Sequence, residues 1–250
     1  MCTLVILRRP GNDWPVLIAA NRDEMIGRPS QPPARHWPDR PDVVAGLDEL
    51  AGGSWLGLND SGVVAGVLNR TGSLGPAPGQ RSRGELVLEA LDHADAKSAA
   101  QALAAIEPRA YRTFNLVVAD NRDAFWLRHA DPSGTLAVTV TPIGTGLAMI
   151  AAGDLDDDTP RLQHYHPLFA AAPPPDPERG DWAAWEALLL DPGTPADGGE
   201  RGMRFATARG FATVSSALIA LPAIERPDLR PSFRFAAHHP VPTPWREVAR

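Results

Sequence analysis

The first 22 residues constrain the fold most strongly, because they contain two strand-like runs joined by a turn. The runs TLVILRR (3–9) and WPVLIAANR (14–22) are rich in apolar and β-branched residues, and PGND lies between them. Two such runs separated by a short turn predict an antiparallel β-hairpin. The runs SWLGLN (54–59) and GVVAGVLNRT (62–71), joined across NDSG, predict a second hairpin of the same kind.

Helical patterns follow these strands. Ser82 and Glu85 have the spacing of a capping box before the apolar segment LVLEAL, and Asp95 can cap a second helix over AKSAAQALAAI. A third helix is predicted over DWAAWEALLL (181–190), with Asp181 as its cap.

The remaining strand-like runs complete an order that favours antiparallel sheets. They are TFNLVVAD, AFWLRHA, TLAVTVTP, GLAMIAAG, ATVSSALIAL and SFRFAAHH. The predicted order is four strands, two helices, four strands, one helix and two strands. Strands that are neighbours in sequence and joined by short turns predict an α+β fold with helices packed outside antiparallel sheets. A Rossmann fold would require strands and helices to alternate.

Composition places the chain among ordinary globular proteins. It has 250 residues, of which 44% are hydrophobic and 22% charged, so it can bury a substantial core. We expect one domain over residues 1–250, with a Pro/Gly-rich insertion around residues 170–203. The net charge of −6 argues against nucleic acid as a partner.

The sequence also predicts a location. A single cysteine excludes an intramolecular disulfide and fits a reducing compartment. No secretory signal pattern is recognisable, and no apolar run approaches the ~20 residues needed to span a bilayer. We therefore expect a cytoplasmic protein without an integral membrane segment.

Cys2 follows the initiator methionine directly. Cysteine is small enough for methionine aminopeptidase to remove Met1. The new chain start would then carry a thiol and a free α-amine, whose reference pKa of about 7.7–8.0 suits a general base. The alternative interpretation is a small apolar residue at the start of a buried strand.

The tetrad NRDE (21–24) ends the second run of the opening hairpin, so it should lie beside the start of the first run. An arginine there could lower the pKa of the Cys2 thiol or hold a substrate carboxylate. An aspartate could orient the new ammonium group. The competing interpretation is a polar turn.

Asn69 ends the apolar run GVVAGVLN. A side-chain amide at a strand end can donate to a developing oxyanion, although asparagine also commonly ends a strand at a turn.

The sequence predicts no metal site. The histidines in HYH (164–166) and HH (238–239) lack the HExxH or CxxC companions of known sites. The acidic run DLDDD (154–158) lacks the glycine and the terminal glutamate of an EF-hand loop.

Five segments together resemble the NRDE family, in the same order from residue 2 to about 221: MCTLVI, AANRDEM, GGSWLGLNDSGVVAGVLNRTG, FNLVVAD and ATVSSALIAL. That family includes the transport and Golgi organisation 2 proteins of eukaryotes. It is similar in turn to cysteine N-terminal nucleophile (Ntn) hydrolases such as choloylglycine hydrolase and penicillin V acylase. The resemblance implies a four-layer αββα sandwich of antiparallel sheets, which agrees with the strand order.

The resemblance also implies roles for particular residues. The expected catalytic residues are Cys2 as nucleophile, Arg22, Asp23 and, in the oxyanion hole, Asn69. A later active-site asparagine of the acylases would fall near residues 152–154, which are Ala-Gly-Asp here. Relatives often have arginine before the paired serines, where this chain has Val214.

Two functions from different classes remain open. The first is a cysteine Ntn amidohydrolase that acts on a non-peptide C–N bond of a small molecule and needs no metal or organic cofactor. Asn21, Glu24 and Asp154 would then bind substrate. The second, implied by the resemblance, is a non-catalytic binding or trafficking protein for haem, lipid or acyl-CoA, and cysteine is a known haem ligand. A third option, an interaction scaffold, would leave these polar residues without a role.

Overall fold

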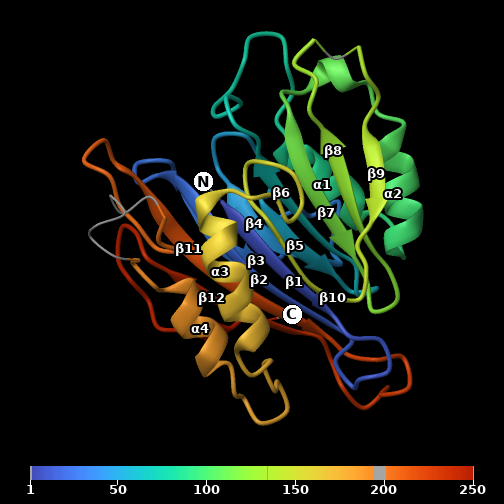
Figure 1. The fold of residues 1–250 in the computed structure, drawn as a ribbon. Coiled ribbons are helices and arrows are strands. Elements are labelled where there is room, and N and C mark those ends of the chain that lie inside the picture. The colour runs from blue at the N-terminus through green and yellow to red at the C-terminus, as the bar shows by residue number, and fades with distance from the viewer. Residues whose placement is uncertain (1, 134, 194–200, 250) are drawn as a thin grey trace. The chain divides into compact units, whose positions relative to one another are not determined.

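The computed structural model describes residues 2–133, 135–193 and 201–249 (Figure 1). The chain divides into two compact units, each built on an antiparallel sheet. The first unit comprises residues 1–28 and 145–247, and the second comprises 29–144 and 248–250. The α+β class with two antiparallel sheets is confirmed, whereas the single-domain organisation stays a prediction.

The sheet of the first unit has the strand order β10-β1-β2-β11-β12-β13. Its strands are β1 (Thr3–Arg8), β2 (Val16–Met25), β10 (Gly146–Ile150), β11 (Phe211–Leu221), β12 (Ser232–Ala237) and β13 (Arg246–Glu247). Two helices pack on this sheet, α3 (Pro160–Ala171) against β10 and α4 (Ala183–Leu189) against β2. The predicted opening hairpin is confirmed, because Arg8 of β1 pairs with Val16 of β2 across the turn.

The sheet of the second unit runs from β3 to β9 in chain order. Its strands are β3 (Ser30–Ala34), β4 (Val43–Asp48), β5 (Leu56–Asn59), β6 (Val64–Asn69), β7 (Phe114–Ala119), β8 (Ala124–His129) and β9 (Thr139–Pro142). Helix α1 (Gly84–Leu91) packs on β4, β5 and β6, and α2 (Ala96–Ala104) packs on β7, β8 and β9. A short 3₁₀ helix over Pro108–Ala110 follows α2.

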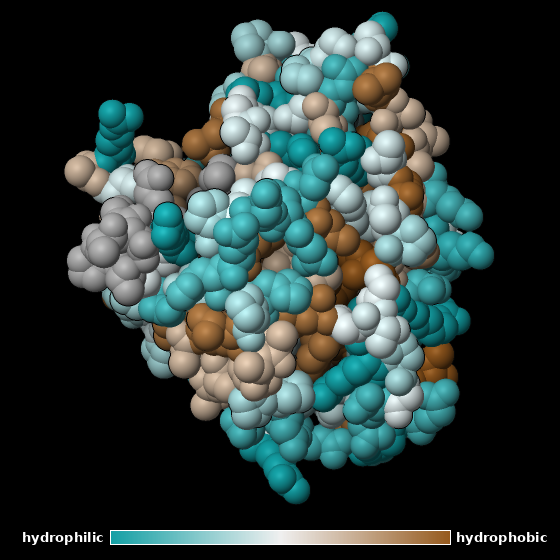
Figure 2. Space-filling model, in the orientation of Figure 1, coloured by the Kyte–Doolittle hydropathy of each residue, from teal (hydrophilic) through white to brown (hydrophobic). Residues whose placement is uncertain are grey.

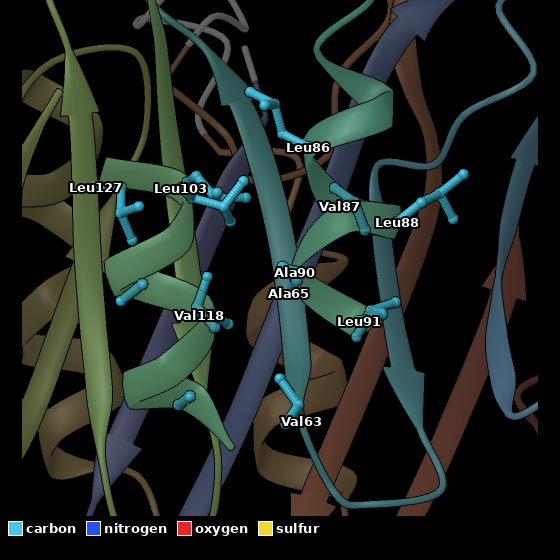
Figure 3. Packing of buried hydrophobic residues seen from close by; sticks show 14 of the residues in the cluster. Val63, Ala65, Leu86, Val87, Leu88, Ala90, Leu91, Leu103, Val118 and Leu127 are labelled. Carbon is cyan, nitrogen blue, oxygen red and sulfur yellow. The ribbon is translucent and has the colours of Figure 1, made fainter. Parts of the chain in front are cut away.

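Each sheet has an apolar core beneath its helix pair. In the first unit, aromatic residues of α3 and α4, including Phe169 and Trp185, pack with alternate residues of β2 such as Leu17 and Ala19. In the second unit, Leu91 of α1 belongs to the cluster that also holds Val63 and Ala65 (Figure 3). The alternation arises because successive side chains of a strand point to opposite faces.

The sequence missed three strands, which are β3, β4 and the two-residue β13, and one α-helix. The proline-rich segment over residues 28–42 contains β3, whose two prolines are tolerated because β3 is the edge strand of its sheet. The neighbouring strand β4 was also missed. Helix α3 was missed because Pro167 lies inside it and its apolar pattern is weak, although Pro160 occupies its first turn.

Of the predicted helix caps, the structure confirms Asp95, whose side chain accepts a hydrogen bond from the Ser98 N–H at 2.7 Å. The capping box at α1 is wrong. The N-cap position is Arg83 rather than Ser82, and the carboxylate of Glu85 accepts from Arg81 instead. Arg81 therefore takes the place of the backbone N–H that Glu85 would have bound in a capping box.

The viewed face of the molecule is mainly hydrophilic, with smaller areas of hydrophobic residues between (Figure 2). Among the described residues, few large apolar residues are more than half exposed, and they are far apart in the sequence. They include Leu50, Leu136 and Val241. Among the described helices, none is long and apolar enough to cross a bilayer.

Gly53, in the segment GGSWLG, allows α1 to approach the sheet closely. A Cβ atom at this position would lie 2.5 Å from the carbonyl carbon of Gly84 and 2.9 Å from the nitrogen of Glu85, both in the backbone. The Ser54 N–H also donates to the Gly84 oxygen at 3.1 Å. This glycine of the family-like segment therefore has a packing role.

We predict that Gly53→Ala lowers the free energy of unfolding by about 1–3 kcal/mol, because backbone atoms must move to admit the methyl group. Urea denaturation followed by circular dichroism measures the change. Gly144→Ala is the matched control in the same unit, since a Cβ there meets nothing within 4 Å. Equal stabilities of the two variants would contradict the packing role.

Candidate functional site

The NRDE tetrad lies within a strand, so the interpretation as a polar turn is wrong. Strand β2 runs from Val16 to Met25 and is paired on both sides. Asn21 is the partner of Thr3 in β1 and of Ser216 in β11. The predicted position of the tetrad beside the start of the first strand is therefore confirmed.

The Cys2 thiol lies against the backbone of Asp23. Its Sγ atom accepts a hydrogen bond from the Asp23 N–H at 3.3 Å and lies 3.5 Å from the Asp23 carbonyl oxygen. Cys2 is half-buried. In the part of the chain that the structure describes, both hydrogen-bond contacts of the thiol are with this one residue.

Burial raises the pKa of the Cys2 thiol above its ordinary value, and the negative charge of Asp23 acts in the same direction. The backbone hydrogen bond from Asp23 and the charge of Arg22 lower this pKa, but they do not reverse the shift. A thiol in this environment is protonated at neutral pH, so its use as a nucleophile requires a base.

The Asp23 carboxylate is held by a cation from another element. Its side chain is fully buried, and Oδ2 accepts from Nη1 of Arg161 at 3.3 Å. The same nitrogen donates to the hydroxyl of Thr3 at 3.1 Å. Arg161 thus connects the start of α3 to both strands that flank Cys2.

Arg161 is a site residue that the sequence did not indicate. It lies in a segment where no helix was predicted, about 140 positions from Asp23, and no motif surrounds it. Its guanidinium group also stacks on Phe205, with its central carbon 5.2 Å from the ring centroid. The proline before it, which begins α3, was the available signal for a helix start.

Asn21 ties three segments of the first unit together. Its amide nitrogen donates to the carbonyl oxygens of Leu189 and Met203, at 2.9 and 2.8 Å. Its oxygen accepts from the hydroxyl of Ser216 at 2.6 Å. Both amide hydrogens are engaged in these contacts, and the predicted substrate-binding role of Asn21 stays a prediction.

His238 ends this hydrogen-bonded chain. Its Nε2 atom lies 2.7 Å from the Ser216 hydroxyl oxygen. Because the single hydroxyl proton of Ser216 goes to Asn21, Nε2 must carry the proton at this contact. The imidazole is therefore a donor to Ser216 and does not act as a base for it.

Burial, with the charge of Arg204 as a smaller cause, lowers the pKa of His238 to about 4. The folded chain thus keeps this ring neutral in a pH range where an unfolded histidine is charged.

The other predicted site residues lie as follows. Arg22 is buried, and Glu24 is partly exposed and lies 3.7 Å from Arg28 as an ion pair. Asp154 belongs to the turn after β10, where its carbonyl oxygen accepts from the Asp157 N–H. Asn69 is the last residue of β6, in the second unit. The predicted catalytic and binding roles of these residues stay predictions.

Residues 152–154, where the resemblance places an asparagine, have a distinct local structure. The Asp157 carboxylate occupies the position of a side chain at Gly153, because a Cβ atom there would lie 1.6 Å from Asp157 Oδ2. At Val214 the pairing of β11 with β2 shifts by one residue, between Thr213 and Ser215. The carbonyl of this valine accepts from the His238 N–H at 2.8 Å.

Residues 1–174 match the model of the family described as Transport and Golgi organisation 2. Since this match covers more than half of the chain, the protein belongs to that family. The mouse (Mus musculus) Transport and Golgi organization 2 homolog is 34% identical over 114 residues, and the human (Homo sapiens) homolog is 36% identical over 115 residues. Each match covers 44% of this chain and only 40% of the relative.

Solved structures with a similar fold are hydrolases and acylases. A Caenorhabditis elegans N-acylethanolamine-hydrolyzing acid amidase ortholog has a TM-score of 0.57 at 13% identity, covering 91% of this chain and 96% of its own. Penicillin V acylase from Agrobacterium tumefaciens has a TM-score of 0.53 at 14% identity, covering 99% and 86%. A mutant conjugated bile acid hydrolase from Clostridium perfringens has 0.55 at 11%, covering 99% and 92%. The Ntn-hydrolase-like fold is confirmed.

We predict that His238→Gln flattens the dependence of stability on pH. The wild type should lose stability as pH falls from about 6.5 to about 4, because the unfolded chain binds a proton that the folded chain excludes. The loss attributable to His238 should be of order 2 kcal/mol. Glutamine retains an N–H donor for Ser216 and does not titrate in this range.

Urea denaturation at several pH values from 4 to 7 measures this difference. His164→Gln is the matched control, because His164 is exposed on α3. If the wild type and His238→Gln lose stability in parallel over this range, the explanation from His238 fails.

Proposed function

We propose that this protein is a cysteine amidohydrolase of the Ntn type, acting on the C–N bond of a small N-acylated molecule. The observation that carries the proposal is the half-buried Cys2 thiol, held against the backbone of Asp23 beside the NRDE strand. The fold adds support, since the similar solved structures are named as an amidase, an acylase and a hydrolase.

The chemistry requires removal of Met1. Sγ of Cys2 would attack the carbonyl carbon of the amide, while the freed α-amine takes the thiol proton. The raised pKa of the thiol makes this base necessary. The α-ammonium group would then protonate the leaving nitrogen as the C–N bond breaks. Water, activated by the same amine, would hydrolyse the thioester to release the carboxylic acid.

Other residues would support these steps. The Asp23 carboxylate would orient the ammonium group, and Arg22 would attract a substrate carboxylate or stabilise the thiolate. A backbone N–H would donate to the oxyanion, and the oxyanion-hole role that the resemblance implies for Asn69 stays a prediction. Asn21, Glu24 and Asp154 are the proposed substrate-binding residues, and Asn21 would act through the segments that it connects.

Haem binding through Cys2 is less well supported by the residues present. A thiolate is the form of cysteine that ligates iron. Burial and the charge of Asp23 both favour the protonated thiol, and the sulfur already takes part in hydrogen bonds to the Asp23 backbone. The Cys2 environment thus favours a nucleophile activated during catalysis over a permanent metal ligand. Lipid or acyl-CoA binding would place no demand on this thiol.

We predict that amide hydrolysis depends on a free α-amine at Cys2. Two forms are prepared by cleavage of a tag, one beginning with Cys2 and the other with a single glycine before Cys2. Against a panel of N-acyl amides, the second form should be slower by about 10²-fold or more, the usual contribution of a general base. Cys2→Ala should abolish turnover.

Intact mass and labelling with a cyanobenzothiazole probe verify the two chain starts. Equal hydrolysis rates for both forms would refute the amine as base. If neither form hydrolyses any amide, and both bind an acyl-CoA or a lipid equally, the binding function is favoured instead.

A further inference from the structure

The charge on the Asp23 carboxylate creates a difficulty for a thiol nucleophile at Cys2. This carboxylate is fully buried, and its negative charge opposes the formation of a thiolate. Inside a protein, such a charge acts more strongly than it would in water. A positive charge close to the carboxylate is therefore expected if Cys2 is to react.

Arg161 is placed to supply this positive charge. It is 9% exposed and lies in the first turn of α3, and one of its nitrogens contacts both Asp23 Oδ2 and Thr3 Oγ1. Thr3 is the residue next to Cys2, and Asp23 is the residue that binds the thiol. The guanidinium group also stacks on the ring of Phe205, with its central carbon 5.2 Å from the ring centroid.

We propose that Arg161 is a positioning residue for Cys2: it balances the charge of Asp23 and fixes this carboxylate and the first residues of β1 relative to each other. The inference rests on the proposed function, because Arg161 affects catalysis only if Cys2 is the nucleophile. It assigns a role to a residue that acts on the thiol through Asp23 and Thr3.

The charged groups that act on the thiol from within the first unit are few. Asp23 and Arg22, both on β2, act on Cys2 directly, and so does the α-ammonium charge at the chain start, which is the same in all the chains compared. Arg161, from α3, acts on Asp23. The net charge of the Asp23–Arg161 pair can therefore be changed in steps of one unit while Arg22 is left in place.

The test measures the rate at which iodoacetamide alkylates Cys2, as a function of pH from 6 to 9. This reaction reports the thiolate and requires no turnover, so it distinguishes failure of this inference from failure of the hydrolase proposal. Four chains are compared: the wild type, Arg161→Met, Asp23→Asn and the double variant. The summed charge of residues 23 and 161 is 0 in the wild type, −1 in Arg161→Met, +1 in Asp23→Asn and 0 in the double variant.

The alkylation rates at pH 7.5 should follow these charges. Arg161→Met should be slower than the wild type by about threefold to tenfold, and Asp23→Asn faster by a similar factor. The double variant should return to within about twofold of the wild type. In a purely structural role, Arg161→Met, Asp23→Asn and the double variant would all break the same contact, so all three would change the rate in the same direction.

Two further variants keep the inference falsifiable. Arg161→Lys retains the charge and should alkylate like the wild type. If Arg161→Met does not fold, Asp23→Asn against the wild type is the informative comparison, because it changes the pair charge by one unit. Arg234→Met is the matched control, because Arg234 pairs with Glu186 and stacks near Trp182 in the same unit. Equal rates for the wild type, Asp23→Asn and the double variant would overturn the proposal.

Discussion

The burial of the Asp23 carboxylate is the constraint on which the arrangement around Cys2 depends. Strand β2 lies inside its sheet, between β1 and β11, and α3 and α4 cover the face toward which Asp23 points. A carboxylate placed there loses its water, and the desolvation penalty is offset only by a well-placed partner. The partner is Arg161, whose position requires α3 to begin at the open end of the β1–β2 hairpin. The start of α3 and the position of the Cys2 thiol therefore both depend on the Asp23 carboxylate.

The three consecutive residues Asn21, Arg22 and Asp23 have different surroundings, because a strand directs alternate side chains to opposite faces. Asn21 and Asp23 lie on the helix-covered face, and Arg22 lies on the other. Asn21 binds the carbonyls of Leu189 and Met203 and, through Ser216, the neutral ring of His238. A polar network of this kind holds its members only when every donor meets an acceptor. His238 completes this network as a donor to Ser216, and its burial keeps the ring uncharged.

Local patterns predicted much of this structure. The opening hairpin, the cap at Asp95 and the position of the NRDE tetrad beside Cys2 all follow from a few adjacent residues. The predictions were wrong where another side chain, or the position of a strand in its sheet, competed with the local signal. Glu85 pairs with Arg81 rather than closing a capping box, and β3 forms despite its prolines because an edge strand needs fewer backbone donors. Helix α3 has too weak an apolar period to be recognised, since its buried face includes an arginine.

By itself the sequence determined where its one cysteine lies, which strand lies beside it and that the sheets are antiparallel. These features depend on hydrophobic alternation and on turn residues that are neighbours in the chain. Only the tertiary structure decided that Arg161 balances Asp23, and that Asn21 serves as a connector between segments. Those pairings join residues more than 130 positions apart. They result from the need to satisfy each buried charge and amide, which a linear pattern of residues does not encode.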